Sequence, residues 1–393
     1  MRVIFLFPHM VMHGGALHYM LHVIDGLQAQ GHTVGVVTLR HDPQRFPVPP
    51  GVDVLTPDDA PITSDLAYWL LAPIWHRRLE RLVMQWQPDA MVSQVFPSNW
   101  WGWFIRRRHP TLPHLFVIQE PSAFIHSDRW IAALRPMWKQ ALARLLRPVL
   151  RSMDLRRAAY TDYAVANSAN TAKAAEAVYG FQSLPLAYPG VDFARFPVSR
   201  GPRREMLVTS GHLSGFKRID FLLEVMSRLT TRRPDIRLNI VGDGPDADRL
   251  RALRSELGLD EHVTFHGRLS DEELVRIYGE SRLYIHGAMH EPFGMSVVEA
   301  LATGTPAAAH ASGGPQEIIA SDAIGVLIDS EDPDAWADAI DAYLSTHTDS
   351  PDLADKCRER AEFFSWDHAI TQIAKGLDDI TKVNPGKDAI CAE

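Results

Sequence analysis

The chain has 393 residues, of which 46% are hydrophobic and 22% are charged, a composition typical of a globular protein with two domains. Its net charge of −8 gives no reason to expect nucleic acid as a partner. The two cysteines, Cys357 and Cys391, provide no disulfide framework, which indicates a reducing, cytoplasmic setting. No apolar run approaches the roughly 18 residues of a transmembrane helix, and the opening "MRVIFLFPHM" predicts a buried strand rather than a secretion signal.

Short apolar runs alternate with longer helical periods through the first half of the chain. A strand is predicted at 2–7 and a helix from about Gly15 to Gln30. Further strands are predicted at 33–39, 90–95, 112–118 and 163–167. Fully apolar strands separated by helices are typical of a parallel sheet that is covered on both faces.

The pattern breaks into Pro, Gly and Arg at 193–205, "FARFPVSRGPRRE", and then starts again. New strands are predicted at "MLVTS", "IRLNIVG", "HVTFHG", "RLYIHG", "TPAAAH" and "IGVLID". The sequence therefore predicts an α/β protein with two doubly wound domains, 1–198 and 199–364, followed by the terminal segment 365–393. Ligands of such sheets bind at the carboxyl ends of the strands, so we expect the site in the strand-to-helix loops.

One such loop carries two glutamates, in "MHEPFGMSVVEALATGTPAAAHASGGPQEII". The helix is predicted to begin near Gly294 and to end at Gly304. The amides of its first turn have no intrahelical partner and favour an anion such as phosphate. Glu291 and Glu299 would then accept hydrogen bonds from hydroxyl groups beside that anion, as on a phosphorylated sugar and a ribose. The alternative is that Glu291 stabilises the start of the helix and Glu299 is solvated.

A second loop, "SGHLSGFKRID", places a lysine among glycines directly after a strand. Gly211, Gly215 and Lys217 would make a phosphate cradle, with the lysine as its point charge. The alternative is that Lys217 and Arg218 lie on a solvated helix face.

Three further features are weaker. Gly14 and Gly15 open the first helix but lack the spacing of a dinucleotide fingerprint, so they admit a ligand or simply form a turn. In "VGDGPDADRL" the Asp246-Ala-Asp248 pair falls in the first turn of a helix, where acids are favoured without any metal. His18 and His22 share a helix face, yet no third zinc ligand is evident nearby.

The region 129–157 combines tryptophan with eight Lys or Arg and a single acid, Asp154. Such a basic, amphipathic segment suits an anionic membrane surface at the inner face of the membrane. The alternative is a partly exposed helix that packs on its own sheet.

Taken together, these loops resemble the GT-B retaining glycosyltransferases of family four, which transfer a sugar from a nucleotide diphosphate donor. The resemblance covers nearly the whole chain. It rests on "GGALHYMLHVIDGLQAQGHTV", "VANSANTAKAAEAVYG", "YPGVD", "SGHLSGFKRIDFLLEV", "VGDGPDADRL", "VTFHGRLSDEELVRIYGES" and "HEPFGMSVVEALATGTPAAAHASGGPQEII". It implies two Rossmann-like domains that face each other across a cleft, with "FSWDHAITQIAKGL" as a terminal helix that crosses back to the first domain.

The resemblance also implies roles for individual residues. Glu291 would bind hydroxyls of the transferred sugar, Glu299 the ribose, and Lys217 the diphosphate, which makes Lys217 and Glu291 the catalytic candidates. The remaining candidates for donor binding are Gly14, Gly15, Gly211, His212, Gly242, Gly244, Pro292, Phe293, Gly294 and Met295. The candidates on the acceptor side, in the first domain, are Trp101, Gln119 and Glu120.

Two positions depart from the family pattern. His212 stands where the family usually has an arginine, which removes a permanent positive charge. Gln119, in "FVIQEPSAF", stands where the family commonly has a histidine, and glutamine cannot act as an acid or a base.

We therefore expect a metal-independent, retaining hexosyltransferase that needs no cofactor. The expected donor is GDP-mannose, with a UDP-hexose next, and the acceptor is a glycan, a lipid-linked sugar or a small molecule. Two alternatives stay open: a sugar-nucleotide 2-epimerase of the same architecture, and a non-catalytic protein that binds sugar nucleotides.

Overall fold

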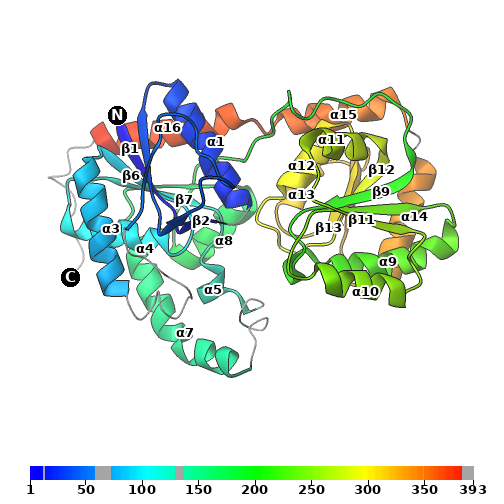
Figure 1. Ribbon diagram of the computed structural model, residues 1–393, viewed down its shortest axis with the longest axis horizontal. Helices are drawn as coiled ribbons and strands as arrows, with labels where there is room; N and C mark the ends of the chain where they lie inside the picture. The colour runs from blue at the N-terminus through cyan, green and yellow to red at the C-terminus, as the bar shows by residue number, and fades with distance from the viewer. Residues whose placement is uncertain (12–13, 58–71, 129–130, 132–136, 348, 383–393) are drawn as a thin grey trace. The chain divides into compact units, whose positions relative to one another are not determined.

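The computed structural model describes residues 1–11, 14–57, 72–128, 131, 137–347 and 349–382. The chain forms two compact units (Figure 1). Unit 1 contains Met1–Tyr188 and the segment that begins at Trp366, and unit 2 contains Pro189–Ser365. The predicted tail beyond Lys382 lies outside the described residues.

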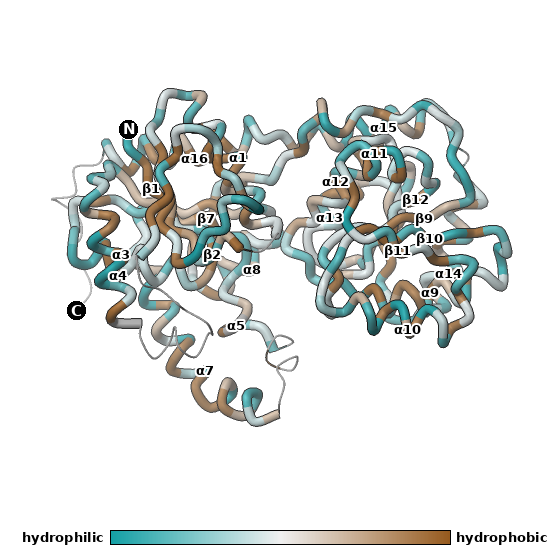
Figure 2. The backbone as a smooth tube through the Cα atoms, viewed as in Figure 1, coloured by the Kyte–Doolittle hydropathy of each residue, from teal (hydrophilic) through white to brown (hydrophobic). Residues whose placement is uncertain are grey.

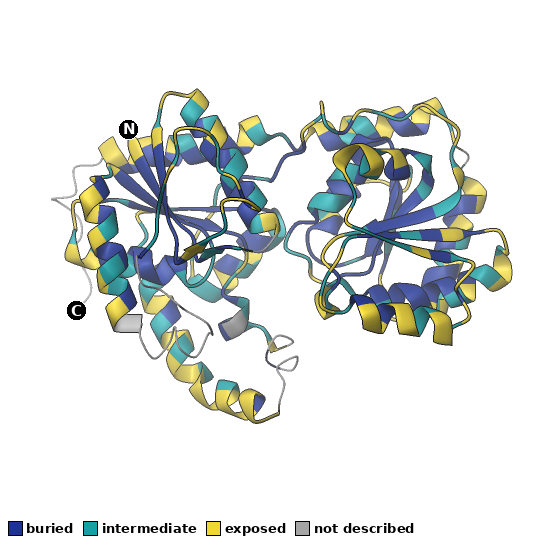
Figure 3. Ribbon diagram, in the orientation of Figure 1, coloured by how far each residue is buried: buried dark blue, intermediate teal, exposed yellow. Residues whose placement is uncertain are grey.

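Unit 1 is built on a six-stranded sheet in which every neighbouring pair is parallel. In spatial order its strands are β5 (Asp53–Leu55), β3 (Thr33–Val37), β1 (Arg2–Leu6), β6 (Ala90–Ser93), β7 (His114–Ile118) and β8 (Tyr163–Ala166). A separate parallel pair consists of β2 (His9–Met10) and β4 (Arg40–His41). The central strands are buried along their length (Figure 3), which explains their unbroken apolar sequence.

Helices cover both faces of this sheet. They are α1 (Gly15–Ala29), α3 (Ala72–Trp86), α4 (Ser98–Arg108), α5 (Ala123–His126), α7 (Met137–Ala158), α8 (Ala169–Tyr179) and α16 (Trp366–Lys382). Because side chains alternate along β1, Val3 and Phe5 pack in one core with α1 and α16, whereas Ile4 and Leu6 pack in another with α3 and α4. The last described helix of the chain thus completes the core begun by the first strand.

Unit 2 repeats the architecture with a second parallel sheet of six strands. In spatial order these are β11 (Val263–Gly267), β10 (Arg237–Val241), β9 (Arg204–Ser210), β12 (Ser281–His286), β13 (Ala307–His310) and β14 (Gly325–Ile328). Its helices are α9 (Ile219–Arg232), α10 (Ala247–Glu256), α11 (Asp271–Glu280), α12 (Met295–Ala302), α13 (Pro315–Ile318), α14 (Pro333–Thr346) and α15 (Pro351–Glu362), with a short 3-10 turn, η1 (Gly215–Lys217). The strands form the apolar centre of the unit (Figure 2).

The division between the units lies ten residues before the predicted boundary at 198/199. Residues 189–203 contain no regular element, so their place is set by contacts rather than by pattern. The Ser199 amide donates to the Thr303 carbonyl over 3.0 Å, and the Phe196 ring lies 6.4 Å from that of Tyr278. These contacts hold the linker on unit 2. The second division, between Ser365 and Trp366, falls within one residue of the predicted one.

Among the described helices, none is both long and apolar enough to span a bilayer.

Candidate functional site

The site in unit 2 begins at the first turn of α12. Gly294 is the N-cap residue and has φ 108°, a left-handed conformation that glycine adopts without strain. Met295 opens the helix, and the amides of Met295 and Ser296 precede the first intrahelical donor, the Val297 amide, which donates to the Gly294 carbonyl over 2.9 Å. The helix ends at Ala302, two residues before Gly304, which also has a positive φ of 84°. The helix predicted from the sequence is therefore confirmed.

Lys217 and Glu291 meet beside this helix start. The Lys217 Nζ lies 2.9 Å from both carboxylate oxygens of Glu291, and each side chain keeps about a fifth to a quarter of its surface exposed. Burial alone would lower the pKa of Lys217, but the Glu291 carboxylate raises it above its usual value. Burial would raise the pKa of Glu291, but the Lys217 charge lowers it well below its usual range. Both groups are therefore held in their charged forms.

The loop that carries Lys217 is supported by the neighbouring loop after β10. The Gly211 amide donates to the Val241 carbonyl over 3.0 Å, and the Leu213 amide donates to the Asp243 carbonyl over 3.1 Å. A Cβ on Gly242 would collide with the Gly211 carbonyl oxygen, and one on Gly244 would collide with that of Leu213. These two glycines are thus required for the close approach of the two loops.

The loop that carries Glu291 is fixed by the segment after β13. The Gly314 amide donates to the Glu291 carbonyl over 2.8 Å, and Glu291 forms a parallel bridge with Gly313. The Ser312 hydroxyl accepts from the His290 amide over 2.9 Å. The "ASGGPQ" stretch therefore positions the first glutamate by backbone contacts.

Glu299 lies one turn into α12 and faces a small polar cluster. The Tyr278 hydroxyl donates to Glu299 Oε2 over 3.4 Å and also contacts Ser210 Oγ at 2.5 Å. Burial raises the pKa of Glu299 above its usual value, and the charge of Arg195 offsets this only in part. This carboxylate has only partial compensation from the protein, in contrast to Glu291.

Three polar residues behind the site were not predicted. The Tyr284 hydroxyl donates to Ser296 Oγ over 2.7 Å, and His286 Nε2 lies 3.7 Å from Glu291 Oε2. Burial lowers the pKa of His286, so the neutral ring adds little charge to the Lys217–Glu291 pair. The available signal was the "RLYIHG" strand, where Tyr284 and His286 are polar groups two residues apart and hence on one face.

The other donor candidates of unit 2 differ in exposure. Gly211 and His212 are exposed at the end of β9, and Pro292 is half-buried. The Phe293 side chain is buried and packs edge-on against Phe364 at 5.3 Å, so only its backbone is placed to meet a ligand.

In unit 1, the candidates Gly14 and Gly15 lie at the start of α1, where Gly14 is the N-cap residue and Gly15 the first helical residue, both exposed. The neighbouring turn is held by Gln94, whose Nε2 donates to the Ala16 carbonyl over 2.6 Å.

Of the acceptor candidates, Trp101 was predicted wrongly. Its side chain is fully buried in the core with α3 and β1, because it lies on the face of α4 that packs against the sheet. Gln119 is buried directly after β7, and Glu120 is exposed.

Gln119 belongs to a row of carboxamides that the sequence did not single out. Gln94, Gln119 and Asn167 directly follow the adjacent strands β6, β7 and β8. Asn167 Nδ2 donates to Gln119 Oε1 over 2.8 Å. Gln94 Oε1, Gln119 Nε2 and Asn167 Oδ1 are buried and have no hydrogen-bond partner in the described part of the chain. Neutral donors and acceptors of this kind match hydroxyl groups.

The candidate metal residues have other contacts. Arg249 lies 3.3 Å from Asp246, and Arg251 lies 2.9 Å from Asp248. His22 stacks on Trp366 of α16 at 4.3 Å, and its ring lies 4.1 Å from that of His18. Within the described ranges, no group of three or more His, Cys, Asp or Glu is arranged to hold a metal ion.

Two family models match the chain and together run from residue 13 to residue 363. "Glycosyltransferase Family 4" matches residues 13–195, and "Glycosyl transferases group 1" matches residues 191–363. With the two parallel sheets and the site described above, these matches place the chain in the GT-B glycosyltransferases of family 4.

Curated relatives include D-inositol 3-phosphate glycosyltransferases from several bacteria. That of Nocardioides sp. is 32% identical over 214 residues, which cover 48% of this chain and 47% of the relative. That of a Mycobacterium sp. is 35% identical over 178 residues, which cover 41% and 39%. The match thus spans about half of the length of these relatives or less.

Solved structures match over nearly the full length. Sucrose-phosphate synthase from Thermosynechococcus elongatus has a TM-score of 0.77 at 21% identity, covering 95% of this chain and 97% of its own. Anabaena HepE in complex with UDP-glucose has a TM-score of 0.71 at 17% identity, covering 96% and 99%. These likenesses concern the fold.

Proposed function

We propose that this chain is a retaining glycosyltransferase that moves a hexose from a nucleoside diphosphate donor to a hydroxyl of its acceptor. The observation that carries the proposal is the Lys217–Glu291 ion pair beside the first turn of α12, with Glu299 one turn further along. It combines a cation, unpaired amides and two carboxylates within one group of loops. This set suits a diphosphate flanked by two groups of hydroxyls.

In the proposed reaction, the bond between the anomeric carbon and the diphosphate oxygen breaks, and the acceptor oxygen bonds to the same face of that carbon. The acceptor proton passes to the departing diphosphate. Lys217 and the amides of α12 stabilise the negative charge that develops on the leaving group, while Glu291 orients the sugar hydroxyls and Glu299 those of the ribose. In this scheme no side chain acts as a nucleophile and no metal or cofactor takes part.

The sequence favours GDP-mannose as the donor. A UDP-hexose is the second candidate, and the fold-level likeness to a protein solved with UDP-glucose makes it a necessary member of any test panel. For the acceptor we propose a sugar-containing or lipid-linked polyol, read in unit 1 by Gln119 with its neighbours Gln94 and Asn167. Curated relatives named for an inositol phosphate add a soluble phosphorylated polyol as a candidate. We propose a cytoplasmic enzyme that acts at the inner membrane face.

A thermal-shift panel tests the donor site. UDP, GDP, ADP and their hexose conjugates are compared on the wild-type chain and on Glu299→Ala, with Glu256→Ala, an exposed residue of α10, as the matched control. We expect one nucleotide to raise the Tm of the wild type and of the control but not of Glu299→Ala. A flat panel contradicts the proposal.

A second measurement separates transfer from its alternatives. The stabilising donor is incubated with acceptors, with and without EDTA. Transfer that persists in EDTA supports the scheme. Donor conversion without an acceptor indicates an epimerase, and binding without any conversion indicates a non-catalytic protein.

A further inference from the structure

Asp154 is a buried carboxylate of α7 that lies outside the donor site. Helix α7 is exposed along most of its length (Figure 3), but Asp154 is fully buried. Its Oδ1 accepts from Trp100 Nε1 over 2.6 Å and from Asn99 Nδ2 over 3.3 Å. Its Oδ2 accepts from His126 Nε2 over 2.9 Å and from the Tyr179 hydroxyl over 3.0 Å. Each oxygen of the carboxylate therefore has two donors.

The four donors lie on three helices, and each of these helices follows one of the carboxamides at the end of the sheet. The helices are α4, α5 and α8. Helix α4 begins four residues after Gln94, α5 begins four residues after Gln119, and α8 begins two residues after Asn167. Because the preceding strands β6, β7 and β8 are neighbours in the sheet, Asp154 joins three adjacent strand-to-helix segments with one side chain.

Short hydrogen bonds connect these helices to the carboxamides. The Gln94 amide donates to Ser98 Oγ at the start of α4 over 3.1 Å. Thr171 Oγ1, in α8, donates to the Gln119 carbonyl over 3.2 Å, and Asn167 Nδ2 donates to Gln119 Oε1 over 2.8 Å. A displacement of α4 or α8 therefore changes the distances between the carboxamides.

Tyr179 extends the network to the backbone beside Gln119. Its hydroxyl donates to Asp154 and accepts from the Ser122 amide over 3.1 Å. Ser122 lies three residues after Gln119 and directly precedes α5. The carboxylate thus acts on both ends of the segment between Gln119 and His126.

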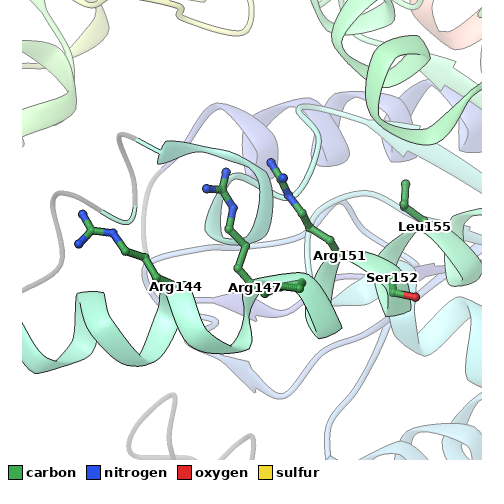
Figure 4. A pocket seen from close by; sticks show the side chains of 6 residues that line it. Arg144, Arg147, Arg151, Ser152 and Leu155 are labelled. Carbon is green, nitrogen blue, oxygen red and sulfur yellow. The ribbon is translucent and has the colours of Figure 1, made fainter.

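Helix α7 also holds the backbone of α5. Arg147 projects from α7 to the same side as Arg144 and Arg151 (Figure 4). Its Nε donates to the Ile125 carbonyl over 3.0 Å, and its Nη2 donates to the His126 carbonyl over 2.8 Å. Helix α5 is therefore bound to α7 both through its main chain and through the His126 side chain.

The carboxyl group must be ionised to accept from all four donors. Burial alone would raise the pKa of this group, but the hydrogen bonds from His126, Trp100 and Tyr179 lower it below its usual value. An asparagine at this position has one acceptor oxygen, and its amide hydrogens would meet groups that also donate. A buried donor that loses its acceptor is costly, so a neutral side chain should displace the helices.

We propose that Asp154 is a positioning residue for the acceptor, because it fixes the spacing of the carboxamides through α4, α5 and α8. Gln94 Oε1, Gln119 Nε2 and Asn167 Oδ1 are buried, have no hydrogen-bond partner among the described residues, and lie on the segments that the carboxylate joins. The inference rests on the proposed function only in assigning the acceptor to this row. A carboxylate that merely stabilises the core would affect the Tm without a selective effect on the acceptor.

Asp154→Asn tests the proposal in the full chain with two readouts. Hydrogen exchange of the ligand-free chain, read by mass spectrometry, should become about tenfold faster in residues 119–127. Kinetics use D-inositol 3-phosphate as the acceptor probe, with GDP-mannose and UDP-glucose as donors. The KM of the acceptor should rise about tenfold, while the KM of the donor, which binds unit 2, should change less than about twofold. Tyr179→Phe removes one of the four hydrogen bonds and should show the same pattern more weakly, so it carries the test if Asp154→Asn does not fold.

The matched control is Glu80→Gln. Glu80 is another buried carboxylate of unit 1, on α3, and it accepts from Arg108 Nε and from His109 Nε2 over 2.7 Å each. The control should lower the Tm but leave both the exchange of residues 119–127 and the KM of the acceptor unchanged.

Unchanged exchange of residues 119–127 in Asp154→Asn and Tyr179→Phe overturns the proposal. An equal rise of the acceptor KM in Glu80→Gln overturns it as well, because the effect then follows from lost stability alone. If the wild type transfers no hexose to the probe, the failure lies with the proposed function or the chosen acceptor, and the exchange data then decide whether Asp154 positions this segment.

Discussion

Lys217 and Glu291 keep each other in the charged form. A diphosphate that binds beside them therefore meets a lysine that is already protonated and positioned. The lysine is positioned by a carboxylate 2.9 Å away, but it retains an exposed side from which phosphate oxygens can approach. Because the lysine is already ordered and charged, little reorganisation is needed when charge develops on the leaving group.

Replacement of Lys217 by methionine tests the role of this positive charge in the proposed transfer. We expect kcat/KM for transfer to fall about 100- to 1000-fold, because one preorganised positive charge is removed from the transition state. Steady-state kinetics with the identified donor give the measurement. Lys356→Met, at an exposed lysine of α15, serves as the control and should be unchanged. Equal rates for both variants would remove Lys217 from the mechanism.

The Glu299 carboxylate is expected to lower the stability of the ligand-free chain at neutral pH. Its pKa is raised by burial, so the folded chain binds this proton more tightly than the unfolded chain does. The group therefore costs stability as the pH rises above its ordinary pKa and through the raised one. We expect Glu299→Gln to raise the Tm of the ligand-free chain at pH 7 to 8, with the difference shrinking toward pH 4. Melting curves across that range supply the check, and a lower Tm at pH 8 contradicts the argument.

Individual residues were predictable where their role follows from position in a loop. Glu291, Glu299 and Lys217 follow strands that end at one edge of the sheet, and the structure brings Lys217 to Glu291. Tyr278 and Tyr284 were not predicted, because their hydrogen bonds to site residues depend on which face of α11 and of β12 is turned toward the site. Trp101 was predicted wrongly for the same reason, since the sequence "NWWGWF" does not reveal which tryptophan faces the sheet.

At the scale of elements, the site depends on two loops that touch backbone to backbone. The loop after β10 supports the loop that carries Lys217, and Gly244 is, with Gly242, one of the two positions where a Cβ would collide with the main chain of the facing loop. Gly244 is not in the left-handed region, so glycine is required there only because the facing loop leaves no room for a Cβ.

Gly244→Ala should therefore displace the 211–217 loop. We expect nucleotide affinity to fall by at least about tenfold and the Tm to drop, since overpacking typically costs about 1–3 kcal/mol. Isothermal titration and melting curves measure the two effects. Gly201→Ala is the control, because a Cβ there meets nothing within 4 Å. Unchanged nucleotide affinity in Gly244→Ala would show that the loops move independently.

Most elements could be predicted from the sequence, because buried parallel strands and amphipathic helices have distinct periods. The boundary between the units could not be predicted, because residues 189–203 show no helix or strand periodicity. They are placed by contacts such as the Ser199–Thr303 hydrogen bond. The row of Gln94, Gln119 and Asn167 also escaped prediction, since it depends on the spatial order β6-β7-β8.

On the scale of the whole molecule, each unit has its own sheet and core, but only unit 2 is continuous in sequence. Unit 1 needs α16, whose Ala369, Ile370, Ile373 and Leu377 are buried in the core with α1 and β1. The contact is close, since a Cβ on Gly26 of α1 would collide with Ile370.

A chain that ends at Ser365 should therefore lose the melting transition of unit 1 and keep that of unit 2. The buried apolar face of α16 would be missing from the first core and water would reach it. Differential scanning calorimetry resolves the transitions, and the stabilising nucleotide identifies the one that belongs to unit 2. A chain that ends at Lys382 retains α16 and should match the full length. If the chain that ends at Ser365 keeps the melting transition of unit 1 unaltered, α16 is not needed for that unit to fold.

The packing of α16 against α1 has a consequence for synthesis on the ribosome. Unit 2 is complete once residue 365 has left the exit tunnel, whereas the sheet of unit 1 still lacks α16 at that point. The nascent sheet of unit 1 thus keeps one apolar face uncovered while the whole of unit 2 is synthesised, and this is the period in which it most needs a chaperone.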